Sequence, residues 1–174
     1  MTSKTEFDAA RQSLHSEAAI KPDSDWRLYH TVLSQFDNID AWTLLNELIQ
    51  NAVDTRATDV TIKLLTDELE FRHNGKEPLS QGSVEGLCAF SKSTKGLDSV
   101  GFMGIGFKSF LRFFYKVTIY DQGIKFAIDI KLKDTGNPDL RDLYRPQWVE
   151  INDVVKGETV FRFSIPHGGA METL

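Results

Sequence analysis

The pattern of hydrophobic and polar positions divides the chain into a helical first third and a strand-rich remainder. Residues 5–20 have the pattern of a polar helix, and residues 25–36 that of a short amphipathic helix. The strongest helix prediction is 39–56, with Asp40 as the expected N-cap. Its apolar positions recur at helical spacing, and they are Trp42, Leu45, Leu48, Ile49, Ala52 and Val53.

After this helix the period changes to that of strands. Residues 59–65 and 68–72 alternate apolar and polar side chains, and Thr66 and Asp67 between them predict a tight hairpin connection. Four more strands are predicted at 116–121, 124–132, 148–152 and 159–165, and short helices at 83–90 and 108–114. Because helices come first and strands follow, we predict an α+β fold, a two-layer α/β sandwich with a mixed, mostly antiparallel sheet backed by helices.

Composition and charge narrow the class of protein. A chain of 174 residues with 41% hydrophobic and 26% charged residues suits one well-packed domain. The single cysteine, Cys88, excludes an internal disulfide and a cysteine-based zinc site, and its apolar neighbours favour a buried thiol. No apolar run of membrane-spanning length and no signal-peptide pattern is present, so we expect a cytoplasmic protein. The net charge of −5 argues against a broad nucleic-acid-binding face, although it leaves room for a local basic patch.

Candidate chemistry begins with a polar stripe on the 39–56 helix. Glu47 and Asn51 are four residues apart and Asp54 follows three residues later, so all three lie on one side of the helix. An amide oxygen suits Mg²⁺, and a carboxylate one turn away could act as general base on water. The alternative is a solvated helix face without chemistry.

A glycine-rich segment, 100–110, is the second candidate. Gly101, Gly104 and Gly106 precede a predicted helix, and Lys108 lies in its first turn. Glycines allow a backbone to approach phosphates, and a helix N-terminus offers free amide groups to an anion. The segment fits neither the dinucleotide fingerprint nor the P-loop spacing. A purely structural turn is the alternative.

Together these segments resemble the GHKL superfamily, most closely its branch of heat-shock chaperones and sacsin. NELIQNAVD (46–54) looks like the first box of the family, and GFMGIGFKS (101–109) looks like its glycine box. SKSTK (91–95) is similar to the lid segment of the chaperone branch, and KGETVFRF (156–163) is similar to the late strand of the family. The resemblance covers residues 40–165.

The resemblance implies a Bergerat-type fold that binds Mg-ATP. Glu47 would then be the general base, Asn51 the Mg²⁺ ligand, and Asp54 a support for the site. Further nucleotide-binding positions implied by the resemblance are His73, Asn74, Gly75, Ser93, Thr94, Lys95, Gly101, Gly104, Ile105, Gly106, Phe107, Lys108 and Thr159. It also implies a helical extension over 1–38, an ATP-binding domain over 39–167, and a tail or linker over 168–174.

The second box of the family departs from its usual form. An aspartate that accepts a hydrogen bond from the adenine amino group normally begins it, whereas this loop reads His73-Asn74-Gly75. A neutral imidazole or an amide oxygen could accept the same bond with different geometry. Both are weaker acceptors than a carboxylate, so we expect less strict selection of the base. The alternative is an ordinary loop histidine.

The expected function is therefore an ATPase domain in which nucleotide binding is coupled to closure of a lid over 91–101. We expect it to be the N-terminal module of a longer protein and to associate with itself or with further domains. One alternative is a non-hydrolysing, nucleotide-gated interaction module, which the altered second box favours and the intact Glu47 opposes. A GHKL-type protein kinase is the other, and the chaperone-like lid and the missing acceptor box argue against it.

Overall fold

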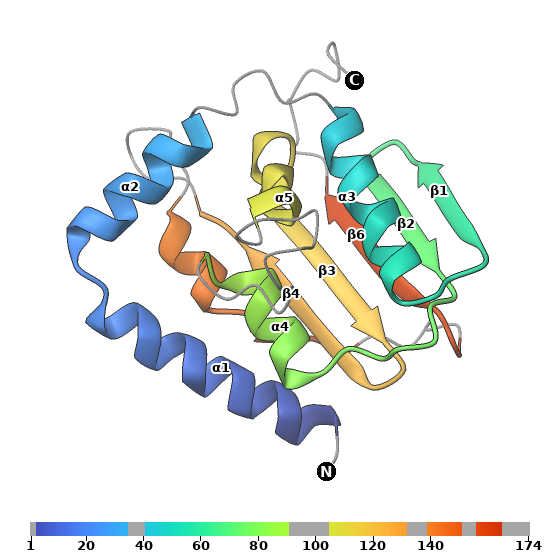
Figure 1. Cartoon of the computed structure of the whole chain (residues 1–174), viewed down its shortest axis with the longest axis horizontal. Coiled ribbons are helices and arrows are strands. Elements are labelled where there is room, and N and C mark those ends of the chain that lie inside the picture. Colours follow the sequence, from blue (N-terminus) through green and yellow to red (C-terminus); the bar gives the residue numbers. More distant parts are fainter. Residues whose placement is uncertain (1–2, 35–40, 91–104, 132–138, 151–155, 165–174) are drawn as a thin grey trace.

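The part of the protein that the structure describes is one layer of helices packed on one six-stranded sheet (Figure 1). The computed structural model describes residues 3–34, 41–90, 105–131, 139–150 and 156–164. This arrangement confirms the predicted α+β, two-layer fold. Among the helices in these ranges, none combines the length and the apolar character that a membrane-spanning helix requires.

The helices follow the predicted order with small shifts at their ends. They are α1 (Ser3–Ile20), α2 (Asp23–Ser34), α3 (Ala41–Asp54), α4 (Gln81–Cys88) and α5 (Ile105–Lys108), with 3₁₀ turns η2 (Ser109–Arg112) and η3 (Leu140–Tyr144). The helix predicted at 108–114 begins earlier, at Ile105, and continues as a 3₁₀ turn. α4 begins at a reciprocal pair of hydrogen bonds between Ser80 and Ser83, which the sequence analysis did not foresee. The predicted N-cap, Asp40, lies outside the described residues.

The last of the described strands lies in the middle of the sheet. The strands are β1 (Val60–Leu64), β2 (Glu68–His73), β3 (Lys116–Asp121), β4 (Ile124–Asp129), β5 (Gln147–Trp148) and β6 (Thr159–Ser164), in the order β1-β2-β6-β3-β4-β5. Each pairing between these strands is antiparallel, so the described part of the sheet is not mixed. Because β6 pairs with both β2 and β3, it joins the hairpins β1–β2 and β3–β4 into one sheet.

Aromatic rings form the core between the helices and the sheet. Phe71, Phe161 and Ile119 are direct partners across three strands and therefore share one face. All three are buried. Phe107 of α5 lies on this row, with 5.8 Å between its ring centroid and that of Phe161. α1 belongs to the same core, because Phe7 is fully buried against the side of the sheet that carries β4 and β5.

α3 buries a narrower face than its periodicity predicts. Leu44, Leu48 and Ala52 are buried. Three other apolar positions of the predicted helix are not enclosed, because Trp42, Ile49 and Val53 are 70%, 40% and 64% exposed. Apolar residues cover more than one side of this helix, and only the side against the sheet is enclosed. Periodicity alone cannot choose between two apolar sides.

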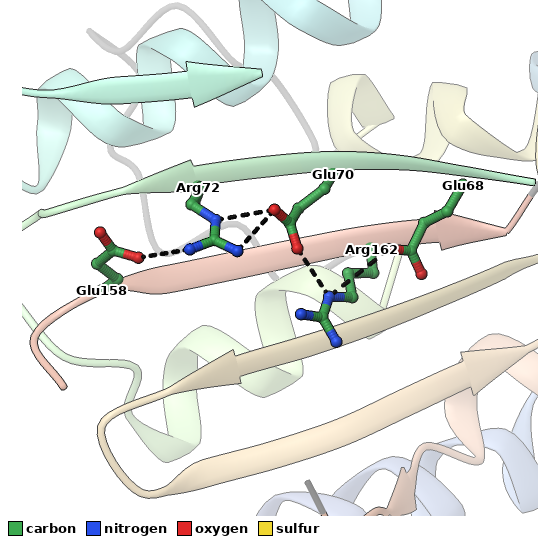
Figure 2. Close-up of polar contacts among 5 residues, drawn as sticks. All are labelled: Glu68, Glu70, Arg72, Glu158 and Arg162. Atoms are coloured by element: carbon green, nitrogen blue, oxygen red, sulfur yellow. Dashed lines mark hydrogen bonds and ion pairs between the residues drawn. The ribbon is translucent and has the colours of Figure 1, made fainter. Parts of the chain in front are cut away.

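The opposite face of the sheet carries a charged network (Figure 2). Glu70 is only 4% exposed, and its carboxylate accepts hydrogen bonds from Arg72 and Arg162, each 2.9 Å from nitrogen to oxygen. Arg72 also pairs with Glu158 at 3.2 Å. Burial by itself would raise the pKa of Glu70, but the hydrogen bonds from the two arginines outweigh it and hold that pKa below its ordinary value. The network joins β2 to β6.

Candidate functional site

The first box and the glycine segment meet where α3 passes α5. The carboxylate of Glu47 lies directly against the backbone of Gly106, in the place that a β-carbon on residue 106 would take. Glu47 and Asn51 are both partly buried, whereas Asp54 at the end of α3 is exposed. The structure therefore brings together Glu47 and Gly106, which are far apart in the sequence. Only glycine at position 106 permits this contact.

The other end of α3 touches the loop that follows β2. A β-carbon on Gly75 would clash with the hydroxyl of Thr55, the residue directly after α3. The backbone carbonyl of Thr55 accepts a hydrogen bond from the amide of Lys76 at 2.8 Å. Arg56, with φ of 60°, ends the helix in the left-handed region. The second box is thus fixed to the end of the helix that carries Glu47 and Asn51.

His73 is the last residue of β2 and is 4% exposed. Its Nδ1 accepts a hydrogen bond from the amide of Gly75 at 3.1 Å. The imidazole stacks on Phe161 with ring centroids 6.4 Å apart. Burial lowers the pKa of His73, so the neutral ring is favoured near pH 7. A neutral ring whose Nδ1 is the acceptor carries its proton on Nε2.

Asn74 has a structural role in the described residues. Its side-chain oxygen accepts hydrogen bonds from the amides of Thr58 and Asp59, at 2.9 and 3.0 Å. Its amide group donates to the side chains of the same two residues at 2.9 Å. Both acceptor atoms considered for the adenine amino group, Nδ1 of His73 and the oxygen of Asn74, therefore already accept hydrogen bonds within the protein.

A row of polar residues crosses the end of the sheet on the side of the helices. His73 is the direct partner of Thr159, and Thr159 is the direct partner of Asp121. The carboxylate of Asp121 accepts hydrogen bonds from the Thr159 hydroxyl and from the amide of Leu79, the latter at 2.5 Å. Burial raises the pKa of Asp121 despite these bonds. Asp121 was not among the predicted site residues, because an aspartate before a glycine turn has the pattern of an ordinary turn residue.

Lys108 is fully buried beside the end of α4. Its ammonium group donates to the carbonyl of Gly86 at 3.2 Å and lies 5.6 Å from the centre of the Phe90 ring. Burial lowers the pKa of Lys108 to about 8. Cys88 is also fully buried, as predicted, and burial raises the pKa of its thiol to about 12. These contacts hold α4 and α5 together, and a contact of Lys108 with nucleotide stays a prediction.

The described site residues form one connected set. Phe107, next to Gly106, packs on Phe161, which stacks on His73. Contacts thus connect Glu47 on α3 to α5, α5 to the sheet, and the loop after the sheet strand β2, at Gly75, to Thr55 at the end of α3. The predicted positions Ser93, Thr94, Lys95, Gly101 and Gly104 lie outside the described residues, as does the predicted lid over 91–101. Ile105 is the first residue of α5.

Comparison with known proteins adds little to this geometry. No family model matches the chain, and no curated protein matches it. A solved structure described as the N terminal domain of a DNA repair protein is similar at 20% identity over 74% of this chain, with a TM-score of 0.43. The matched part is 37% of that structure, so this chain spans well under half its length. A likeness this distant carries no functional argument.

Proposed function

We propose that this chain binds Mg-ATP and hydrolyses it. The observation that supports the proposal is the contact of the Glu47 carboxylate with the backbone of Gly106, with Asn51 one helical turn further on the same side of α3. A partly buried carboxylate held at a glycine segment is suited to activating water beside a bound phosphate. The resemblance to GHKL proteins in both segments points the same way.

In the proposed mechanism Glu47 accepts a proton from the attacking water. Its position depends on Gly106, because any larger side chain at that position would displace the carboxylate. Partial burial limits the number of competing water molecules around this group. A positioned general base contributes about 10²- to 10⁴-fold to a reaction rate.

Asn51 has suitable donor chemistry for a magnesium ion. The residues that the structure describes contain no group of three or more histidine, cysteine or acidic side chains that could hold a metal by themselves. Mg²⁺ commonly takes one or two protein ligands and completes its shell with phosphate oxygens and water. The partly buried amide of Asn51 fits the role of a single protein ligand. The bound ion would neutralise charge on the phosphates.

Association with another surface is part of the proposal. The exposed apolar side chains Trp42, Ile49 and Val53 of α3 support it, because such residues seldom gather on a free surface without a partner. The cytoplasm is the compartment that we propose.

A non-hydrolysing, nucleotide-gated module is the second candidate. The observation that favours it is the engagement of His73 Nδ1 and the Asn74 oxygen within the protein, which removes the expected acceptors for adenine. The same experiment separates the two candidates. It measures ATP binding and phosphate release by the wild type, by Glu47→Gln and by Glu77→Gln, an exposed control.

If the chain is an ATPase, the Glu47→Gln variant should bind ATP with wild-type affinity and should release phosphate at least about 10²-fold more slowly than the wild type. Glu77→Gln should behave as the wild type. Binding without any turnover by the wild type would favour the second candidate, and normal turnover by Glu47→Gln would remove Glu47 from the mechanism.

A further inference from the structure

The row His73–Thr159–Asp121 presents a fixed pattern of hydrogen-bonding groups at the end of the sheet. His73 and Thr159 are direct partners on neighbouring strands, so their side chains lie on the same face and within a few ångströms of each other. Both are buried to more than nine-tenths. The hydrogen bonds that these two side chains make within the protein determine which of their atoms can still bind a ligand.

For His73 the remaining group is a donor. Nδ1 receives the Gly75 amide, so the single proton of the neutral ring is on Nε2. No hydrogen bond between the residues that the structure describes uses Nε2. Stacking on Phe161 and the Gly75 bond fix the ring in both plane and direction. The N–H of Nε2 is therefore held in one orientation.

For Thr159 the remaining group is an acceptor. Its hydroxyl proton is donated to the Asp121 carboxylate, so its oxygen offers only a lone pair to another molecule. Asp121 is itself held by the amide of Leu79, which keeps this arrangement in place. The end of the sheet thus presents a donor on β2 beside an acceptor on β6.

We propose that His73 and Thr159 read the pairing edge of adenine as a donor–acceptor pair, with the His73 N–H donating to the ring nitrogen N1 and the Thr159 oxygen accepting from the 6-amino group. This inference rests on the proposed nucleotide binding. In this inference His73 donates a hydrogen bond to the base, whereas the sequence predicted an acceptor at this position.

Guanine presents the opposite pattern on the same edge. Its N1–H would face the His73 N–H, and its O6 would face the Thr159 oxygen, so both contacts become repulsive. Discrimination against guanine should be strong, because two donors or two acceptors would face each other and each of these groups would also lose its hydrogen bond to water. ATP should therefore bind about 10²-fold more tightly than GTP, a wider margin than the sequence analysis expected.

The first test needs no nucleotide. Long-range proton–nitrogen NMR correlations distinguish the two neutral tautomers of histidine, and the chain has only four histidines to resolve. The His73 signal is the one that disappears in the His73→Gln variant. The proton is expected on Nε2, and a proton on Nδ1 in the wild type would overturn the inference.

The second test measures the affinity of the wild type for three nucleotides with Mg²⁺. They are ATP, 1-deaza-ATP, which lacks the N1 acceptor, and purine riboside triphosphate, which lacks the 6-amino group. The 1-deaza analogue should bind about tenfold more weakly than ATP. His73→Phe, which keeps a ring to stack on Phe161, should remove this difference and keep the preference for the 6-amino group. Thr159→Val should show the reverse pattern.

The outcomes separate this inference from the proposed function. If the wild type binds no purine triphosphate, both fall. If ATP binds but the 1-deaza analogue binds equally well, or if His73→Phe removes the preference for the 6-amino group, nucleotide binding stands and the donor–acceptor reading is wrong.

Discussion

The carboxylate of Glu47 lies against the α-carbon of Gly106, in the space that any other residue would fill with its β-carbon. This contact joins α3 to the start of α5 and fixes the position of the proposed general base. A substitution at Gly106 can therefore test the role of the Glu47 carboxylate without changing Glu47 itself.

Gly106→Ala should lower phosphate release by about 10²-fold, because a displacement of the general base by about an ångström is enough for a loss of that size. The free energy of unfolding should change little, because the atoms that must move are the terminal atoms of the flexible Glu47 side chain. Phosphate-release assays and denaturant unfolding measure the two effects. Gly157→Asn is the control, because Gly157 has φ of 86° with open space around it and asparagine tolerates that region. Unchanged turnover in Gly106→Ala would show that the Glu47 position is not critical.

Asn51→Ala should weaken ATP binding in the presence of Mg²⁺ by about tenfold, because a direct ligand is worth on the order of 1–2 kcal/mol and Mg²⁺ tolerates poor geometry badly. Binding in the presence of a chelator should change little. The matched control is Asn46→Ala, an exposed asparagine on the same helix. Equal loss of affinity with and without Mg²⁺ would contradict the assignment of Asn51 as the metal ligand.

Glu70→Gln should lower the free energy of unfolding at pH 7 by about 1–3 kcal/mol, because two arginines lose a buried carboxylate partner. The folded-state pKa of Glu70 is below its unfolded value, so its contribution is complete above the unfolded pKa and is lost as the pH falls through the folded pKa. The difference between wild type and variant should therefore shrink under acid conditions. Urea unfolding at a series of pH values measures it.

Glu68→Gln is the control for that series. Glu68 is more exposed and lies 3.7 Å from Arg162, so its loss should cost well under about 1 kcal/mol. A difference between wild type and Glu70→Gln that stays constant down to strongly acid pH would argue against the charged form as the source of the stabilisation.

Lys108→Met should change how the free energy of unfolding depends on pH, because it removes a buried ammonium group. The pKa of Lys108 is lowered to about 8 by burial, so between that pH and its ordinary value of 10.5 the unfolded chain binds more protons than the folded one. The free energy of unfolding of the wild type should therefore rise relative to the variant by about 1 kcal/mol per pH unit over this window. Lys131→Met, at an exposed lysine, is the control. Parallel stability curves for the wild type and Lys108→Met would contradict a lowered pKa.

The sequence by itself determined the elements and the class of fold. Alternation and helical spacing predicted β1 to β4, β6 and the positions of α1 to α4, because these periods follow from backbone geometry within a few residues. The strand predicted at 148–152 overlaps β5 only at Trp148. The burial of Cys88 also followed from its apolar neighbours. The candidate site segments on α3 and α5 were predicted as well, and the structure places Glu47 beside Gly106.

Only the tertiary structure decided which atoms of the site remain available to a ligand. The exposure of Trp42, the bond between His73 and Gly75, and the place of Asp121 beside Thr159 all depend on contacts between distant segments. A local pattern gives the side chain at each position but not its partner. The register of β2, β6 and β3 sets those partners, and with them whether His73 offers a proton or a lone pair.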